Sequence, residues 1–211
     1  HEKGIKVGAY VQSIGTVFFE GIVNEEPSVM EWVQKDYLGR IPMYYNSYFR
    51  YIPCINKEDY LKYVEKGIKF AIENLNADLV FFDNYGYYSF ACTCEECKIA
   101  FKEYLNNKYP DSKARMERFG FVKTDGILPP VFFDKLNWDY TDPFLYAGIE
   151  PGLINDPVYQ EWIDFRCWRL GEVSKRFRNF IKNISPNIAI IFNAPYMGPM
   201  GGLNNSVFHG I

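Results

Sequence analysis

The sequence predicts a mixed α/β fold built on a parallel sheet, and three observations support this class. Near-continuous apolar runs, typical of buried parallel strands, occur at residues 4–11, 78–83 and 187–193. Stretches in which apolar residues recur at helical spacing separate these runs. Strands that alternate with helices favour right-handed crossovers and a parallel sheet, which is either doubly wound or closed into a (β/α)8 barrel.

The first run, residues 4–11, contains several β-branched residues and predicts a buried strand. Asn56 is the expected N-cap of a helix, because the acidic residues Glu58 and Asp59 follow in what would be its first turn. The apolar residues that recur at helical spacing after this cap are Leu61, Val64, Ile68, Ala71 and Leu75. The pattern predicts a helix with one apolar face.

The second run, residues 78–83, predicts a strand that is covered on both faces, and a helix over residues 94–109 follows it. Asp156 and Pro157 form the expected start of a long helix, with the aspartate as N-cap. Its apolar stripe consists of Tyr159, Ile163, Cys167, Leu170, Phe177, Ile181 and Ile184. This helix ends before Pro186, and residues 187–193 predict a last buried strand.

Long segments rich in aromatic and polar residues follow the three predicted strands, at residues 12–55, 84–93 and 194–211. Barrel enzymes carry their active sites in the loops at the carboxyl ends of the strands. No G-x-G-x-x-G or G-x-x-x-x-G-K-[ST] motif follows any strand, which argues against a dinucleotide site and a P-loop. We therefore expect a functional site at the carboxyl ends of the strands.

Composition excludes two classes of partner and favours a third. The 211 residues are 48% hydrophobic and 23% charged, as in ordinary globular domains. The net charge of −3 and the lack of a basic block argue against nucleic acid, and no apolar run is long enough to span a membrane. The first residues lack an initiator Met and a signal-peptide core. Aromatic residues make up 18% of the chain and predict a surface for a flat, partly apolar ligand.

Three of the five cysteines, Cys92, Cys94 and Cys97, fall within six residues at a loop-to-helix junction. A helix N-terminus stabilises thiolates, and three converging sulfurs suit tetrahedral Zn²⁺ with a fourth ligand from elsewhere. Cys54 is the candidate fourth ligand, and an uncoordinated or disulfide-linked group is the alternative. Cys167 lies on the apolar stripe of the long helix, where we expect a buried free thiol.

Taken together, these motifs resemble the catalytic barrel of the glycoside hydrolase family 42 β-galactosidases. The matching segments are Gly4 to Val7, Tyr51 to Cys54, Tyr85-Gly86, Cys92 to Cys97, the F-x-x-Y-L-x-x-K-Y segment from Phe101 to Tyr109, Trp162 to Phe165, and Asn193. The resemblance covers nearly the whole chain. It implies part of a (β/α)8 TIM barrel with long βα loops, whose strands match about the third to fifth of eight.

The resemblance also implies a structural Zn²⁺ held by Cys54, Cys92, Cys94 and Cys97, and no catalytic cofactor. The predicted strands begin near residues 5, 78 and 187. The spacing between these starts is far wider than the roughly 30 residues per βα unit of a complete barrel. We therefore expect residues 1–211 to form a single domain that is an incomplete, interior segment of a longer barrel.

The family's acid/base glutamate ends the fourth strand in an Asn-Glu dipeptide before Tyr-Gly, where this sequence has Asp83-Asn84. Asn84 cannot transfer a proton, so Asp83, at the strand's carboxyl end, is the candidate catalytic carboxylate, aimed by a one-residue bulge. Glycoside hydrolysis normally needs a second carboxyl group. The resemblance would place the nucleophile on the seventh strand, beyond Ile211. The loop acids that could reach the same site are Glu20, Asp139, Asp142 and Glu150.

Sugars present flat C–H faces flanked by hydroxyls, which suit stacked rings with phenolic donors. The expected substrate-binding residues are therefore Tyr10, Tyr85 and Tyr87, together with Asn84 and Asn193 at strand ends. Loop packing and backbone capping are the alternative roles of these side chains.

These observations predict a glycoside hydrolase-like protein that acts on a glycan or glycoside by carboxylate acid/base chemistry, with a carbohydrate as its partner. Asn84 favours one alternative, a catalytically inactive hydrolase-like barrel that binds carbohydrate. A zinc-stabilised protein-interaction module, with the aromatic residues at its interface, is a further alternative. The sequence also leaves open the alternative of a homo-oligomer formed through parts of a longer chain outside residues 1–211.

Overall fold

The computed structural model describes residues 4–12, 17–18, 22, 24–41, 50–83, 85–86, 92–130 and 156–193. Its main sheet has three parallel strands in the order β1-β4-β5, formed by Gly8–Gln12, Leu79–Asp83 and Ala189–Phe192. Gln12 lies opposite Asp83 in the first pairing, and Phe82 lies opposite Phe192 in the second. The chain therefore has the predicted mixed α/β character with a parallel sheet.

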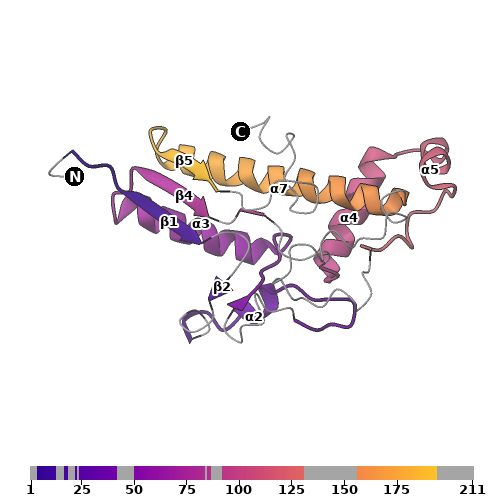
Figure 1. Ribbon diagram of the computed structural model, residues 1–211, viewed down its shortest axis with the longest axis horizontal. Coiled ribbons are helices and arrows are strands. Elements are labelled where there is room, and N and C mark those ends of the chain that lie inside the picture. Colours follow the sequence, from indigo (N-terminus) through magenta and orange to yellow (C-terminus); the bar gives the residue numbers. More distant parts are fainter. Residues whose placement is uncertain are drawn as a thin grey trace, which may run out of the picture.

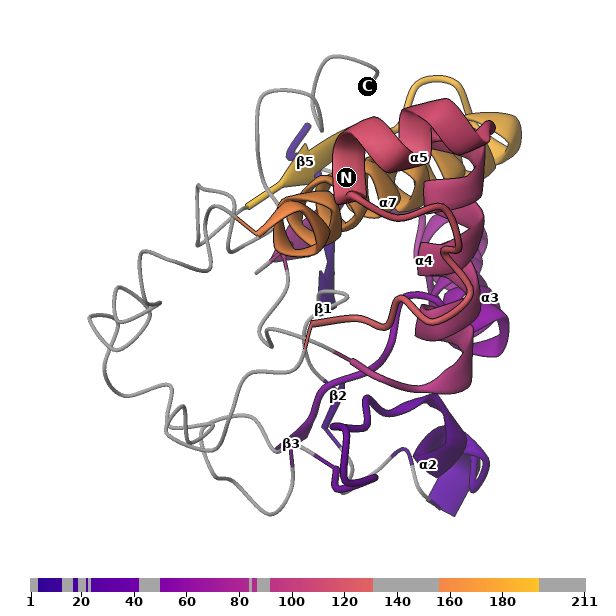
Figure 2. The ribbon, with the colours of Figure 1, turned by 90° about the vertical axis from the view of Figure 1, so that its right-hand side faces the viewer.

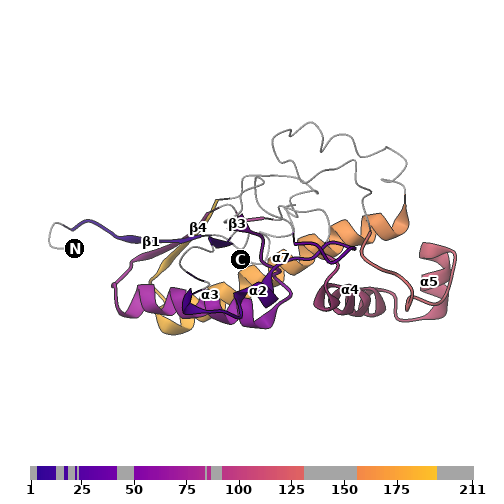
Figure 3. The same cartoon turned by 90° about the horizontal axis from the view of Figure 1, so that it is seen from below.

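Two long helices lie on the same face of this sheet (Figure 1). Helix α3 (Glu58–Glu73) lies in the connection from β1 to β4, and helix α7 (Pro157–Ile184) leads into β5. Figure 3 shows both helices on one side of the three strands. Arg176 of α7 fastens them to each other, since its Nε donates to Glu65 Oε1 at 2.7 Å and its Nη1 to Glu58 Oε2 at 2.6 Å.

Helix α3 confirms the predicted amphipathic helix, with Leu61 and Ile68 completely buried on its apolar face. Two details differ from the prediction. The N-cap is Lys57 rather than Asn56, whose side chain instead donates to a cysteine sulfur. Leu75 lies beyond the helix end and is exposed.

Helix α7 begins as predicted, because the Asp156 carboxylate accepts a hydrogen bond from the Tyr159 backbone N–H at 2.9 Å and Pro157 occupies the first turn. Its apolar stripe enters the core, and Cys167 on that stripe is a buried free thiol, as expected. Burial raises the pKa of Cys167 to about 11, which makes this thiol unreactive at neutral pH.

The core lies between the sheet and the two helices. Val80 and Phe82 of β4 are completely buried, and the Phe82 ring stacks on Phe177 of α7 with centroids 5.5 Å apart. The other face is open among the described residues, where Tyr10 is 59% and Ile191 46% exposed. The prediction of strands buried on both faces is therefore wrong for this part of the chain, because both helices pack on one face and alternate side chains point to the other.

The remaining elements lie around this unit (Figure 2). The predicted loop at residues 12–55 contains the antiparallel pair β2 (Val17–Phe18) and β3 (Arg50–Tyr51) and the short helix α2 (Val29–Trp32). Helix α4 (Glu95–Lys108) confirms the predicted helix after β4. Helix α5 (Ser112–Phe119) was not predicted.

Helix α5 begins where the Asp111 side chain accepts from the Ala114 N–H at 2.8 Å, and it ends at Gly120, whose φ of 76° suits glycine. Glu161 of α7 joins α4 and α5 to the core. Its buried carboxylate accepts hydrogen bonds from Lys108 Nζ and Tyr109 Oη at 2.7 Å and from Arg118 Nε at 2.8 Å. In the part of the chain that the structure describes, no helix has the length and apolar character needed to cross a bilayer.

Candidate functional site

The four predicted metal ligands, Cys54, Cys92, Cys94 and Cys97, meet in one buried cluster. All four Sγ atoms lie within 4.8 Å of one another. Cys54 Sγ is 3.3 Å from Cys97 Sγ and 3.6 Å from Cys94 Sγ, and none of the four forms a disulfide. A tetrahedral ion with metal–sulfur bonds of about 2.3 Å would hold its sulfurs about 3.8 Å apart, so these four residues fit a metal ion.

Three chain segments bring the sulfurs together. Cys54 lies just before α3, and its backbone N–H donates to the Trp32 carbonyl at 2.8 Å. Cys94 is the N-cap of α4, and Cys97 lies in its first turn. The Lys35 backbone N–H donates to Cys92 Sγ at 3.5 Å, and the Asn56 side-chain Nδ2 donates to Cys97 Sγ at 3.1 Å. The cluster therefore fastens the starts of both helices to the segment around Trp32.

Hydrogen bonds between the sulfurs shift the pKa values of the cysteines in opposite directions. A hydrogen bond from Cys54 is the main cause of a lowered pKa at both Cys92 and Cys94, and the pKa of Cys94 falls to about 7. The same bonds raise the pKa of Cys54 well above its ordinary value. The sulfur contacts therefore favour the thiolate form at Cys92 and Cys94 over Cys54 and Cys97, whose pKa values are both raised. Buried thiolates are soft ligands that select Zn²⁺, Cu⁺ or iron–sulfur chemistry over Mg²⁺ and Ca²⁺.

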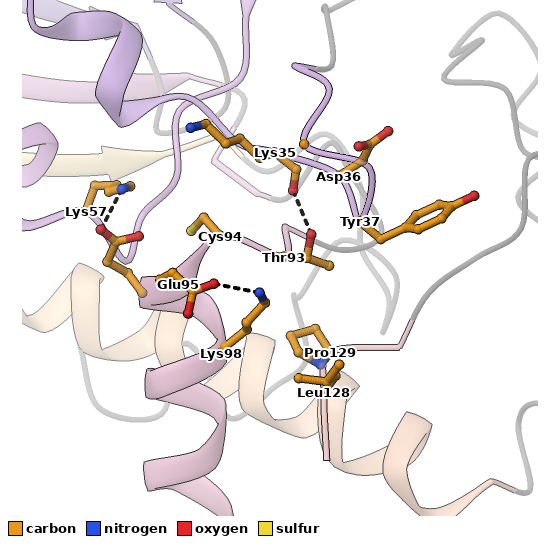
Figure 4. Close-up of a pocket in the computed structure, with 12 residues that line it drawn as sticks. Lys35, Asp36, Tyr37, Lys57, Thr93, Cys94, Glu95, Lys98, Leu128 and Pro129 are labelled. Carbon is orange, nitrogen blue, oxygen red and sulfur yellow. Dashed lines mark hydrogen bonds and ion pairs between the residues drawn. The ribbon is translucent and has the colours of Figure 1, made fainter. Parts of the chain in front are cut away.

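A cavity of about 470 Å³ lies beside Cys94 and is lined in part by Lys35, Tyr37 and Thr93 (Figure 4). Two ion pairs stand in its wall, from Lys57 Nζ to Glu96 Oε1 at 2.5 Å and from Lys98 Nζ to Glu95 Oε1 at 2.6 Å. Cys94 is only 7% exposed, so this cavity borders one side of a cluster that is otherwise buried.

A second group of predicted residues meets at the carboxyl ends of the parallel strands. Asp83 is the last residue of β4. Tyr10 of β1 donates its hydroxyl to Asp83 Oδ2 at 2.5 Å, and Asn193, directly after β5, donates its Nδ2 to Asp83 Oδ1 at 2.5 Å. Each carboxylate oxygen therefore has a donor from a neighbouring strand. We call Asp83, Tyr10 and Asn193 the strand-end site.

The strand-end site is open to solvent on its Tyr10 side, since Tyr10 is 59% exposed. The hydrogen bond to Asp83 is the main cause of a raised pKa at Tyr10, so the phenol stays protonated and donates. Backbone pairing supports the geometry, because the Asn193 N–H donates to the Phe82 carbonyl at 2.8 Å. No bulge is needed to aim Asp83, since the regular register with β1 and β5 already brings its carboxylate to Tyr10 and Asn193.

Tyr85, predicted to bind substrate, lies elsewhere. Its side chain is completely buried, and its hydroxyl contacts the Leu170 carbonyl at 3.0 Å and Ser174 Oγ at 2.5 Å, both on α7. Burial raises its pKa. Tyr85 is therefore a core residue that fixes the turn after β4 to α7, and we leave it out of the strand-end site. Asn84, Tyr87 and the four candidate loop acids lie outside the described residues.

Sequence reasoning assigned Asn56 to helix capping and missed its contact with Cys97. The sequence shows only that Asn56 lies two residues from Cys54 and is therefore near the predicted metal site. The partner of Asn56 on its other side, Arg169 of α7, is 113 positions away in the chain and could not be read from spacing.

No family model matches this sequence, and no curated protein matches it. Three solved β-galactosidases resemble it in fold. That of the Antarctic haloarchaeon Halorubrum lacusprofundi aligns over 98% of this chain with a TM-score of 0.65 and 18% identity. That of Marinomonas ef1 aligns over 98% with a TM-score of 0.59 and 18% identity, and that of Bacillus circulans sp. alkalophilus over 82% with 0.53 and 19%.

This chain covers 29%, 29% and 24% of those three proteins, so it spans less than a third of their length. At identities this low, the likeness is one of fold.

Proposed function

We propose that this chain is part of a carbohydrate-active (β/α)8 barrel whose strand-end site hydrolyses a glycosidic bond, with Asp83 as the ionised carboxylate of the catalytic pair. The observation that carries the proposal is the convergence of Asp83, Tyr10 and Asn193 at the carboxyl ends of three adjacent parallel strands. Barrel enzymes place their catalytic groups at these ends. The fold likeness to β-galactosidases supports the same class.

The open face of the sheet supports a barrel over a doubly wound sheet. In a barrel, helices cover only the outer face, and the inner face is filled by side chains from the other strands. The helices on one face and the exposed Tyr10 and Ile191 on the other match that arrangement. A doubly wound sheet would carry helices on both faces.

The hydrogen bonds at Asp83 distinguish between the roles of a catalytic carboxylate. Glycosidases use one protonated carboxylic acid, which protonates the leaving group, and one ionised carboxylate, which attacks the sugar or activates water. Both oxygens of Asp83 accept hydrogen bonds, and donors favour the charged form. Asp83 therefore suits the ionised role, and the proton donor has to be a second acid.

The exposed ring of Tyr10 and the amide of Asn193 are the proposed substrate contacts of this site. A sugar placed over Asp83 would meet the Tyr10 ring with a C–H face and the Asn193 amide with a hydroxyl. Asn84 and Tyr87 stay candidates for the same role from the segment that follows β4.

We also propose that Cys54, Cys92, Cys94 and Cys97 hold a structural Zn²⁺. The ion would supply a four-way crosslink between the starts of α3 and α4 and take no part in the reaction, since a closed set of four cysteines leaves no position for a substrate. Elemental analysis of the purified protein should return about one zinc per chain. Less than one tenth of an equivalent of any transition metal, after growth with zinc, would contradict this.

A panel of 4-nitrophenyl glycosides tests the activity. We expect the protein to release nitrophenol from at least one of them, faster than buffer alone. Glycan binding on an array without any turnover would replace this proposal with the inactive carbohydrate binder, which Asn84 at the family's glutamate position favours. If the protein neither binds glycans nor releases nitrophenol, that result would favour the protein-interaction module.

A further inference from the structure

The metal cluster receives a hydrogen bond from a side chain that is held in place by the long helix. Asn56 Nδ2 donates to Cys97 Sγ at 3.1 Å. On its other side, Asn56 Oδ1 accepts from Arg169 Nε at 2.8 Å. Arg169 also donates from Nη2 to the Ile55 carbonyl at 3.2 Å. The Arg169 guanidinium thus donates hydrogen bonds to Ile55 and Asn56, the two residues that follow the proposed ligand Cys54.

The Arg169 contact decides which end of the amide faces the sulfur. A guanidinium has five donors and no acceptor, so only the oxygen of Asn56 can face it. The amide nitrogen is then turned toward Cys97 Sγ. Without Arg169 the amide could rotate and present its oxygen to a thiolate, which would be repulsive.

Four thiolates around a divalent ion carry a net charge of −2, and hydrogen-bond donors to the sulfurs stabilise this charge and orient the ligands. Resting on the proposed metal site, we infer that Asn56 and Arg169 are positioning residues of that site. Arg169 fixes the amide, and the amide holds the Cys97 thiolate in its binding orientation. Metal affinity is therefore coupled to the docking of α7, although no residue of α7 is a ligand.

Co²⁺ titration of the whole chain tests this inference, because Co²⁺ bound by thiolates gives charge-transfer absorption that a merely structural change does not shift. Asn56→Asp keeps the shape and an acceptor for Arg169 but replaces the N–H with a carboxylate oxygen. We expect about 10- to 100-fold weaker Co²⁺ and Zn²⁺ binding by chelator competition and an altered charge-transfer band. Arg169→Met should weaken binding in the same direction, and Arg169→Lys should restore part of the loss.

Arg176→Met is the matched control. Arg176 lies on the same helix about two turns further along, and it pairs with Glu58 and Glu65 rather than with the metal site. This variant should lower the melting temperature and leave Co²⁺ affinity unchanged. Wild-type affinity in both Asn56→Asp and Arg169→Met would overturn the inference while leaving the metal site intact. A wild-type chain that binds neither Co²⁺ nor Zn²⁺ would instead overturn the metal site, and the inference with it.

Discussion

The cysteine cluster and the strand-end site differ in how completely the protein encloses them. The four cysteines are at most 7% exposed and form one buried cluster. Tyr10 of the strand-end site is 59% exposed. A closed set of ligands is typical of a structural metal centre, whereas a reactive site has to leave room for its substrate. The degree of enclosure therefore supports the proposed structural role of the cysteine cluster and the proposed catalytic role of the strand-end site.

Losing a metal ligand should have the largest effect on the closed region. Cys54→Ser removes one of the four proposed ligands and leaves the other thiols buried, so we expect zinc content below one tenth of an equivalent and a loss of at least about 4 kcal/mol in the free energy of unfolding. Cys167→Ala, at the buried free thiol, is the control and should keep its zinc. Full zinc in Cys54→Ser would remove Cys54 from the ligand set.

The buried carboxylate of Glu161 and its partners Lys108, Tyr109 and Arg118, here called the Glu161 cluster, form an enclosed polar group without a proposed metal. This cluster tests whether enclosure alone gives a polar group a structural role. Glu161→Gln leaves Lys108 and Arg118 without their shared carboxylate, and we expect a loss of about 3 kcal/mol by urea unfolding. Glu172→Gln, which breaks an exposed pair with Lys175, should cost less than about 0.5 kcal/mol. Equal losses in the free energy of unfolding for the two variants would show that enclosure does not determine how much an ion pair contributes to stability.

The pH dependence of that cluster follows from the same contacts. Burial opposes the charge on Glu161, but the hydrogen bonds from Lys108 and Tyr109 outweigh burial and lower its pKa below the ordinary 4.5. A lowered pKa in the folded state contributes stability that is present above pH 4.5 and lost as the pH falls through the folded value. Wild type should lose stability over this acid window, and Glu161→Gln should lose less. Parallel curves of unfolding free energy against pH for wild type and Glu161→Gln would contradict this expectation.

Within the strand-end site, the donors to Asp83 should each have a moderate effect on turnover. Tyr10→Phe and Asn193→Ala remove one hydrogen bond to a charged group, which is worth about 1.5 kcal/mol, so kcat/KM should fall about 10-fold in each. The melting temperature should stay near that of wild type because both side chains are exposed. A fall in melting temperature without a change in kcat/KM would make these residues structural.

Tyr85→Phe should have the smallest effect and separates the two tyrosines. The lost hydroxyl leaves Ser174 bonded to the Leu170 carbonyl at 2.8 Å, so we expect a cost of about 1 kcal/mol in stability and unchanged kcat/KM. If Tyr85→Phe slows turnover as much as Tyr10→Phe does, Tyr85 belongs to the site.

The two regions also differ in what their sequences could predict. The cysteine cluster was predictable because three of its four cysteines fall within six residues, so local geometry brings them together. The convergence of Asp83, Tyr10 and Asn193 was predictable because the carboxyl ends of parallel strands share one edge of the sheet, whereas their catalytic and binding roles stay predictions. Tyr85 was misplaced because the chain leaves the strand after Asp83, and its ring then packs on Phe192 with centroids 4.6 Å apart.

Other errors have similar physical causes. Apolar runs in the strands predicted cover on both faces, but which elements provide that cover is a long-range property that no local pattern encodes. Helix α5 was missed because it is short and Phe119 is its one buried residue, and its contacts, such as that of Arg118 with Glu161, are long-range. The link from Arg169 to Cys97 depends on how α7 docks, which the sequence pattern does not specify.

The most direct test of the central claim compares wild type with Asp83→Asn on aryl glycosides whose leaving groups differ in acidity. An ionised catalytic carboxylate is needed whatever the leaving group, so we expect a loss of about 10²- to 10⁴-fold in kcat/KM even with 2,4-dinitrophenyl glycosides, which need no protonation. A loss confined to poor leaving groups would make Asp83 the proton donor. Turnover at the wild-type rate would remove Asp83 from catalysis.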